Sequence, residues 1–229
     1  INVQAKEYNR FNNISIEDGL SQATVETMMQ DSKGYIWLGT NDGLDRYNGY
    51  TFKKYSYEKG QENSLINGYI LDIKEDSEGN IWVATAAGIS KIYNNGEKVQ
   101  NYTSDSESGN LSNDNTATML ISSSNKIYVG TAEGINLYDK KTDKFNLIYP
   151  ELKEEYINSL AEDKYGNIWA GTENGLYKIN VGTNVIERFE STDDVNTISE
   201  NYIYKVYYDG DKHIWIGTYD NYKVERMAQ

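Results

Sequence analysis

A seven-residue pattern of hydrophobic and polar positions is written five times along the chain. The first copy is GYIWLGT at residues 34–40, and the later copies are GNIWVAT at 79–85, NKIYVGT at 125–131, GNIWAGT at 166–172 and KHIWIGT at 212–218. The aromatic residues that anchor the copies are Trp37, Trp82, Tyr128, Trp169 and Trp215. Because side chains alternate between the two faces of a strand, each copy predicts a strand with two apolar faces. Such a strand needs a neighbouring sheet on either side.

Polar positions before each anchor predict a tight turn and an earlier strand. Six residues before the anchor stand Asp31, Asp76, Ser122, Asp163 and Asp209. Three residues before it stand Gly34, Gly79, Asn125, Gly166 and Lys212. An Asp that caps its own backbone, followed by a residue tolerant of positive φ, is typical of a hairpin turn. The apolar residues at nine and twelve positions before each anchor therefore belong to an innermost strand.

Two more strands are expected after each anchor. The third strand is predicted at 44–47, 89–93, 135–138, 176–179 and near 222–227, and four-residue windows at 52–55, 99–102, 145–148 and 186–189 predict the fourth. The anchors are 45, 46, 41 and 46 residues apart. A period in the forties with short Gly-bounded strands is typical of β-propeller blades. We therefore predict an all-β fold, a single β-propeller domain over residues 1–229 with five four-stranded antiparallel blades.

The last blade lacks a fourth strand before the chain ends. Residues 8–11, Tyr8-Asn9-Arg10-Phe11, repeat the fourth-strand window at the other end of the sequence. We expect this N-terminal strand to complete the last blade, because ring closure removes an exposed sheet edge. The alternative is that the five repeats are an arc of a larger propeller. The chain opens on Ile1, and we expect it to be a piece of a longer protein.

Composition excludes several classes of function. The formal net charge of -13 argues against nucleic acid or anionic lipid as a partner, since both need clustered Lys and Arg. The chain has no Cys and one His, His213, so neither thiolate chemistry nor a His cluster is expected. We predict no cofactor, no metal site and no catalytic residues. The Thr that ends each second strand stands in five equivalent positions, which favours a structural role.

The repeat, an Asp, a Gly, Ile-Trp-x-Gly-Thr, then Gly-Leu and an aromatic residue, resembles the two-component regulator propeller repeat. The first copy, from Asp31 to Phe52, and its lead-in Asp18-Gly19-Leu20-Ser21 are similar to that family. The resemblance implies an extracytoplasmic sensor piece of a bacterial membrane-anchored regulator, reaching the membrane only through its parent protein. Some members of the family respond to carbohydrate fragments. Departures in the third copy, Tyr128 and Ser122, and in the fifth, Asn221, weaken the match locally.

The loops between second and third strands form a predicted ring of polar residues around one end of the central channel. The candidates for ligand binding in this ring are Asn41, Asp42, Glu133, Glu173, Asn174, Tyr219 and Asp220. Carboxylates there can accept hydrogen bonds from sugar hydroxyls, and Tyr219 can stack on a sugar ring. The alternative is a solvated polar rim without a ligand.

Three functions remain open from the sequence. The first is a non-catalytic sensor domain that binds a small molecule or an oligosaccharide. The second is an interaction module that mediates homodimer formation, and the third is an enzyme similar to the streptogramin-inactivating lyases. The third hypothesis requires a convergent acid/base pair and a metal site, and these are difficult to assemble with a single His.

Overall fold

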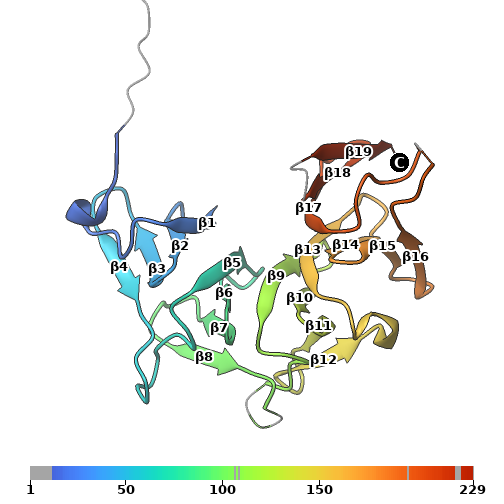
Figure 1. The fold of residues 1–229 in the computed structure, drawn as a ribbon. Coiled ribbons are helices and arrows are strands. Elements are labelled where there is room, and N and C mark those ends of the chain that lie inside the picture. The colour runs from blue at the N-terminus through green and yellow to red at the C-terminus, as the bar shows by residue number, and fades with distance from the viewer. Residues whose placement is uncertain (1–11, 106, 108, 195, 220–222, 229) are drawn as a thin grey trace, which may run out of the picture.

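Five antiparallel sheets follow one another around an arc, so that five blades are confirmed (Figure 1). The computed structural model describes residues 12–105, 107, 109–194, 196–219 and 223–228. The first sheet contains β1 (Val25–Gln30), β2 (Ile36–Thr40), β3 (Gly43–Tyr47) and β4 (Phe52–Tyr55). The second contains β5 (Ile70–Glu75), β6 (Ile81–Thr85), β7 (Gly88–Ile92) and β8 (Val99–Tyr102). The third contains β9 (Thr116–Ile121), β10 (Ile127–Thr131), β11 (Gly134–Asp139) and β12 (Lys144–Ile148).

The last two sheets continue the arc. The fourth contains β13 (Ile157–Glu162), β14 (Ile168–Thr172), β15 (Gly175–Asn180) and β16 (Val185–Phe189). The fifth contains β17 (Ile203–Tyr208), β18 (His213–Thr218) and β19 (Val224–Ala228). Two short 3-10 helices, Ile16–Asp18 and Pro150–Leu152, lie in the segments that lead into blades 1 and 4. Each sheet runs in chain order from an inner strand near the centre of the arc to an outer strand (Figure 1). The predicted closing strand at residues 8–11 lies outside the described residues.

The Asp that opens each turn also holds the anchoring indole. Trp37, Trp82 and Trp169 are at most 2% exposed, and each donates its indole N–H to that Asp at 2.8 or 2.9 Å. The same carboxylates accept backbone N–H groups of the turn. A buried N–H without a partner would cost free energy, so the Asp and the Trp depend on each other. In blade 3 the pair is Ser122 and Tyr128, which has no indole N–H to satisfy.

A cation on the third strand packs over each indole. Arg46, Lys91, Lys178 and Arg226 lie directly across the strand pair from the four Trp anchors, with the charge 4.8 to 6.0 Å from the ring centroid. Such cation–π contacts stabilise an aromatic ring by about 0.5–2 kcal/mol, more when desolvated. In blade 3 the residue across from Tyr128 is Leu137. Asp, Trp and cation are therefore replaced together in that blade.

Blades pack through a small residue on the second strand. A Cβ atom on Gly39 would lie 2.6 Å from Ile70, and one on Gly130 would lie 2.6 Å from Ile157, each at the start of the next inner strand. The equivalent pair between blades 2 and 3 is Ala84 and Thr116. The extra methyl group of Ala84 is accommodated because Thr116, on the facing strand, is smaller than the Ile found at the other interfaces. This close approach buries both faces of the middle blades.

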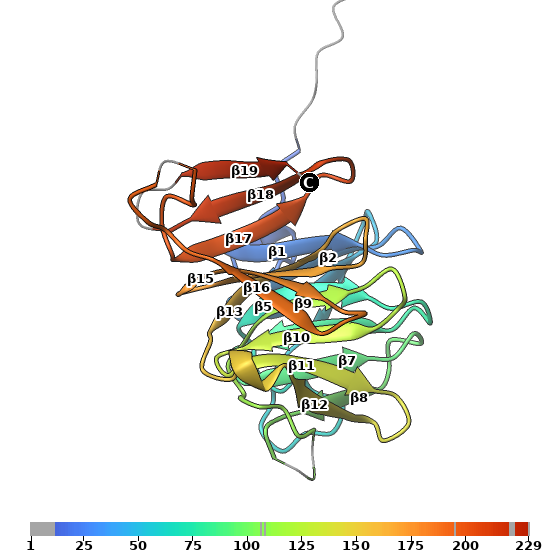
Figure 2. The same cartoon turned by 90° about the vertical axis from the view of Figure 1, so that its right-hand side faces the viewer.

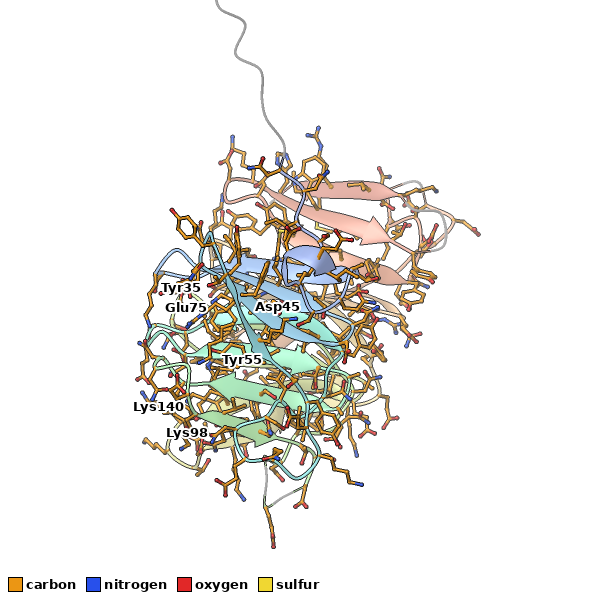
Figure 3. All side chains as sticks on the ribbon, turned by 90° about the vertical axis from the view of Figure 1, so that its left-hand side faces the viewer. Tyr35, Asp45, Tyr55, Glu75, Lys98 and Lys140 are labelled. Atoms are coloured by element: carbon orange, nitrogen blue, oxygen red, sulfur yellow. The ribbon has the colours of Figure 1, made fainter. Side chains whose placement is uncertain are left out.

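The lead-in to a blade is tied to the middle of its third strand. The backbone N–H and hydroxyl of Ser21 both donate to Asp45 at 2.7 Å, and Asp45 is fully buried in blade 1 (Figure 3). Equivalent hydrogen bonds occur in the next two blades. The N–H of Ile66 donates to the Ser90 hydroxyl, and the N–H of Ser112 donates to the side-chain oxygen of Asn136, each at 2.9 Å. These buried polar side chains therefore fix the loops at the end of the strands where each inner strand begins.

The two ends of the arc each present an exposed sheet face. Met28 on β1 is 70% exposed and Tyr207 on β17 is 63% exposed, whereas every residue of the inner strands β5, β9 and β13 is buried or half-buried. A Cβ atom on Gly217, the last copy of the small residue, would meet no atom closer than 3.6 Å. Strand β19 lies at one edge of the molecule in the view of Figure 2. No helix among the described residues is both long enough and apolar enough for a transmembrane span.

Candidate functional site

The ends of the inner strands where the chain enters each blade follow one another along the arc (Figure 1), and we call this edge of the molecule the channel rim. It consists of the residues at the start of β1, β5, β9, β13 and β17 together with the loops that follow β2, β6, β10, β14 and β18. Each inner strand has a register shift after its first residue, in all five blades. A β-bulge changes the direction of a side chain and is frequent beside binding sites. The bulged residues in blades 4 and 5 are Asn158 and Tyr204.

Tyrosines gather on the rim over blades 4 and 5. The rings of Tyr202 and Tyr219 are stacked with centroids 4.8 Å apart, and Tyr204 lies 6.2 Å from Tyr219. Tyr204 is 59% and Tyr219 is 47% exposed, so their rings are open to a ligand. Tyrosine offers a flat apolar face together with a hydroxyl. This is the combination that a sugar ring, with its C–H faces and hydroxyl edges, can contact.

Glu173 acts on Tyr202 of this cluster and on Tyr156, whose hydroxyl reaches blade 3. Burial raises the pKa of Tyr202, and the negative charge of Glu173 raises it further. Burial also raises the pKa of Tyr156, opposed by its hydrogen bond to Asn115 and assisted by Glu173. The Tyr156 hydroxyl donates to the Asn115 side chain at 3.3 Å. Both phenols therefore stay neutral at physiological pH and keep an O–H donor, while Glu173 supplies an acceptor.

The structure brings only some of the predicted rim residues together. Glu173 and Tyr219 both lie beside Tyr202 and belong to one cluster. Asn174 donates to Glu155 at 3.0 Å, and its carbonyl oxygen accepts from Arg188, so its polar groups are engaged within blade 4. Glu133 accepts from Asn113 at 3.1 Å on blade 3.

The other predicted residues lie apart or outside the description. Asn41 and Asp42 are exposed on blade 1, where Asp42 lies beside Gly68 of the next lead-in. Asp220 lies outside the described residues.

Sequence reasoning missed the residue that directly precedes each inner strand. These residues are Thr24, Tyr69, Asn115, Tyr156 and Tyr202. Three of the five are tyrosine at one structural position, a signal that the printed sequence contains. The bulged Tyr204 had no comparable signal, since a bulge breaks the alternation that assigns side chains to faces.

Below the rim, the inner strands β5, β9, β13 and β17 line an open hollow of about 280 Å³. Its walls combine apolar side chains such as Met119 and Val206 with the ion pair of Lys74 and Asp72, whose atoms are 2.6 Å apart. Asp72 also accepts the backbone N–H of Met119 from the next blade at 2.8 Å. Asp72 therefore links blade 2 to blade 3.

The residue types that suggested chemistry in the sequence have structural partners. The Thr hydroxyls that end β2, β6, β10 and β14 donate to the carbonyl of the Gly three residues later, at 2.8 to 3.2 Å. His213 is hydrogen-bonded to Asp209 of its own turn at 2.9 Å. In the part of the chain that the structure describes, no group of three or more His, Asp or Glu could hold a metal ion.

Comparisons with known proteins identify the repeat. The sequence pattern of the two component regulator propeller family (Reg_prop) matches residues 19–42, 64–87, 151–174 and 197–220. Each match runs from a lead-in through an inner strand to the loop after the second strand. The resemblance stated from the motif is therefore confirmed. Blade 3, where Asp, Trp and cation are replaced, is the blade without a match.

Individual relatives share a short sequence or the fold. Histidine kinase P4 of Formosa agariphila is 53% identical over 38 residues, which is 17% of this chain, and the chain spans only 3% of that relative. The extracellular domain of a putative hybrid two component system from B. thetaiotaomicron matches with a TM-score of 0.50 and 18% identity, over 94% of this chain and 41% of that one. A catalytically inactive virginiamycin B lyase from Staphylococcus aureus with quinupristin matches with a TM-score of 0.66 and 14% identity, over 92% of this chain and 71% of the lyase. Both likenesses to solved structures show the fold.

Proposed function

We propose that this chain, which carries two component regulator propeller repeats, is a sensor-type propeller that binds an oligosaccharide at the channel rim. The observation that carries the proposal is the cluster of Tyr202, Tyr204 and Tyr219 beside Glu173. Repeats of this family and the fold shared with an extracellular two-component domain support a sensor role. The same support favours a place outside the cytoplasm, in a parent protein anchored in the membrane.

Binding without turnover is the mode that the described rim supports. Stacked rings hold the apolar face of a sugar, and the carboxylate of Glu173 with the neutral phenols exchanges hydrogen bonds with its hydroxyls. The one His is engaged in a turn, and the Thr hydroxyls close hairpins. The fold shared with a lyase adds no catalytic group to these residues.

The experiment is a thermal-shift screen of plant and microbial oligosaccharides, followed by calorimetric titration of each hit. A ligand present at 100 times its Kd stabilises the folded state by about 2.7 kcal/mol, which raises the melting temperature. Tyr202→Ala and Tyr219→Ala should each weaken binding about tenfold, because one aromatic contact contributes on the order of 0.5–1.5 kcal/mol beyond its buried area.

The matched control is Tyr165→Ala. Tyr165 is 69% exposed in the turn of blade 4 at the opposite end of the strands, so its loss should leave affinity unchanged. The rim proposal fails if no oligosaccharide stabilises the chain, or if Tyr165→Ala weakens a hit as much as Tyr219→Ala does.

A second candidate is an interaction module that forms a homodimer. The observation that favours it is the exposure of Met28, Tyr207 and Val224 on β1, β17 and β19 at the ends of the arc. Light scattering over a dilution series should show a dimer that Tyr207→Glu dissociates. A monomer at every concentration would count against this candidate.

A further inference from the structure

Neighbouring blades in this chain meet through the same two surfaces. One is the front face, which we define by four positions: the first and fourth residues of the inner strand, and the residues just before and just after the aromatic anchor. In blades 2 to 5 these residues are Ile70, Ile73, Ile81 and Val83; Thr116, Met119, Ile127 and Val129; Ile157, Leu160, Ile168 and Ala170; and Ile203, Val206, Ile214 and Ile216. Each of them is at most 8% exposed, because each front face packs on the blade before it.

The second surface is the receiving face, on the other side of each blade. Its centre is the small residue two positions after the anchor, beside the ring of the anchor. A Cβ atom on Gly39, Gly130 or Gly171 would lie 2.6 or 2.7 Å from the Ile that begins the next inner strand. Trp37 and Trp169 pack in the same apolar clusters as the front faces that cover them. The small residue therefore forms a slot for the first residue of the next front face.

The front face of blade 1 is apolar and uncovered at one end of the arc (Figure 1). Its four residues are Val25, Met28, Ile36 and Leu38. Met28 is 70% exposed and the other three are half-buried, whereas the equivalent residues of the other blades are buried. Apolar patches that stay exposed on a folded protein commonly mark interaction sites.

The receiving face of blade 5 is uncovered at the other end of the arc. Trp215 and Gly217 are both half-buried, and a Cβ atom on Gly217 would meet no atom closer than 3.6 Å. Val25, the first residue of the uncovered front face, is smaller than the Ile at three of the slots within the chain. It has about the shape of Thr116, which packs on Ala84 between blades 2 and 3. The two uncovered faces are therefore complementary in size.

Polar groups at the far end of the strands match as well. Glu75, the last residue of an inner strand, accepts the N–H and the hydroxyl of Ser32 in the turn of the preceding blade, both at 2.7 Å. The same arrangement joins blades 3 and 4. The equivalent residues of the two uncovered faces are Gln30 and Gly210. The side-chain carbonyl of Gln30 can accept the N–H of Gly210 without placing a charge between the faces.

We propose that a second copy of this chain covers these faces head to tail, so that the front face of blade 1 in one copy packs on the receiving face of blade 5 in the next. The proposal rests on the interaction module named above as the second candidate, and adds that the interface joins unlike faces. A second copy fits because the chain already forms this interface at every junction between its own blades. Two front faces would instead bring Met28 against Met28 without a slot. A head-to-tail contact leaves one face of each kind uncovered on the pair, so association continues unless the copies close into a ring.

The test is light scattering with gel filtration of the full chain over a dilution series. The mean mass should rise with concentration. Met28→Glu places a charge on the front face, and Gly217→Val fills the slot of the receiving face, so each variant should stay monomeric. Both positions lie on an uncovered face, and both variants should therefore fold, which circular dichroism checks.

An equimolar mixture of these two variants tests the orientation. Each variant keeps the face that the other has lost, so the mixture should form a 1:1 heterodimer and stop at two chains. No intact face then remains for a third chain.

Two further substitutions are matched controls. Gly217→Ala should associate as the unchanged chain does, because Ala84 already packs on Thr116, whose shape Val25 shares. Val185→Glu on β16 adds the same charge as Met28→Glu at a residue that is 54% exposed and belongs to neither face, so association should be unchanged.

The outcomes separate this proposal from the second candidate. If the unchanged chain associates but the mixture stays monomeric, like faces meet and the head-to-tail contact is overturned, while the homodimer candidate stands. Association of Gly217→Val alone would overturn the head-to-tail contact in the same way. A monomeric unchanged chain at every concentration would overturn both.

Discussion

Single residues in this chain depend on partners that lie six or nine positions away. The indole N–H of each buried Trp donates to an Asp six residues earlier, and the indole ring packs against a cation across the strand pair. Sequence reasoning identified the Asp as a turn residue but not as the partner of the Trp. The signal was available, since Ser122 replaces Asp in the one copy where Tyr128 replaces Trp. In blade 3, the replacement of Trp by Tyr is thus accompanied by replacement of both the Asp and the cation that contact Trp in the other blades.

A double-mutant cycle in blade 2 measures this dependence. Asp76→Ser alone should destabilise the chain by about 1–3 kcal/mol, because the buried Trp82 N–H loses its acceptor. In the Trp82→Tyr background the same change should cost about 1 kcal/mol less, since no indole N–H remains. Urea unfolding of the four proteins gives the free energies. Additive effects of the two substitutions would contradict the assigned pairing.

Acid should weaken the chain through the turn carboxylates. Burial alone would raise the pKa of Asp163, but hydrogen bonds from Asn167, Trp169 and the turn backbone outweigh it and lower the pKa below its usual value. A carboxylate with a lowered pKa contributes stability above its unfolded pKa of about 3.9, and this is lost as the pH falls through the folded value. The difference in unfolding free energy between the unchanged chain and Asp163→Asn should therefore shrink from pH 5 to pH 3. A constant or growing difference would argue against the pairing.

At the scale of the element, hydrophobic alternation was enough to predict strands and turns. Both faces of the second strand are apolar, and this required neighbours on both sides, as found for β6, β10 and β14. Alternation could not predict the rim, because the bulge at the start of every inner strand changes which way Asn158 and Tyr204 point. The loops after the second strands were placed correctly. The hydrogen bonds of their side chains could not be predicted, because partners such as Glu155 for Asn174 come close only in the folded chain.

The spacing between blades should be sensitive to one methyl group. Gly130→Ala would place a Cβ 2.6 Å from Ile157 and 2.7 Å from Thr118, and overpacking of this kind costs about 1–3 kcal/mol. Adding Ile157→Thr should recover part of the loss, because blade 2 already combines Ala84 with Thr116. The control is Gly217→Ala, whose new Cβ has no neighbour closer than 3.6 Å and which should change stability by less than about 0.5 kcal/mol. Thermal and urea unfolding measure these differences, and equal losses for both glycines would refute the packing account.

At the scale of the whole molecule, the ends of the arc differ from its middle. Trp215 is only half-buried, whereas three other anchors are fully covered by an aromatic residue of their own fourth strand or a neighbour. A groove of about 320 Å³ runs beside β19, lined in part by Phe189, Ile198 and Met227. This is the place that a fourth strand of blade 5 would cover. The sequence predicted residues 8–11 for it, and that assignment stays a prediction.

Removal of residues 1–11 tests the closing strand. If Tyr8 and Phe11 cover β19, the shortened chain should exchange the amide protons of β19 faster and melt at a lower temperature. The exposed edge should also increase aggregation. The double variant Tyr8→Ala and Phe11→Ala should reproduce the effect without a change of length. Unchanged exchange at β19 in both variants would favour an arc completed by other blades.

The most direct test of the sensor account is hydrogen exchange of the full chain with and without an oligosaccharide hit from the screen. The account predicts slower exchange at the rim segments 154–158, 172–175 and 201–205, and no change at the opposite turns 31–35 and 163–167. Protection confined to the opposite turns, or to no segment at all, would contradict it.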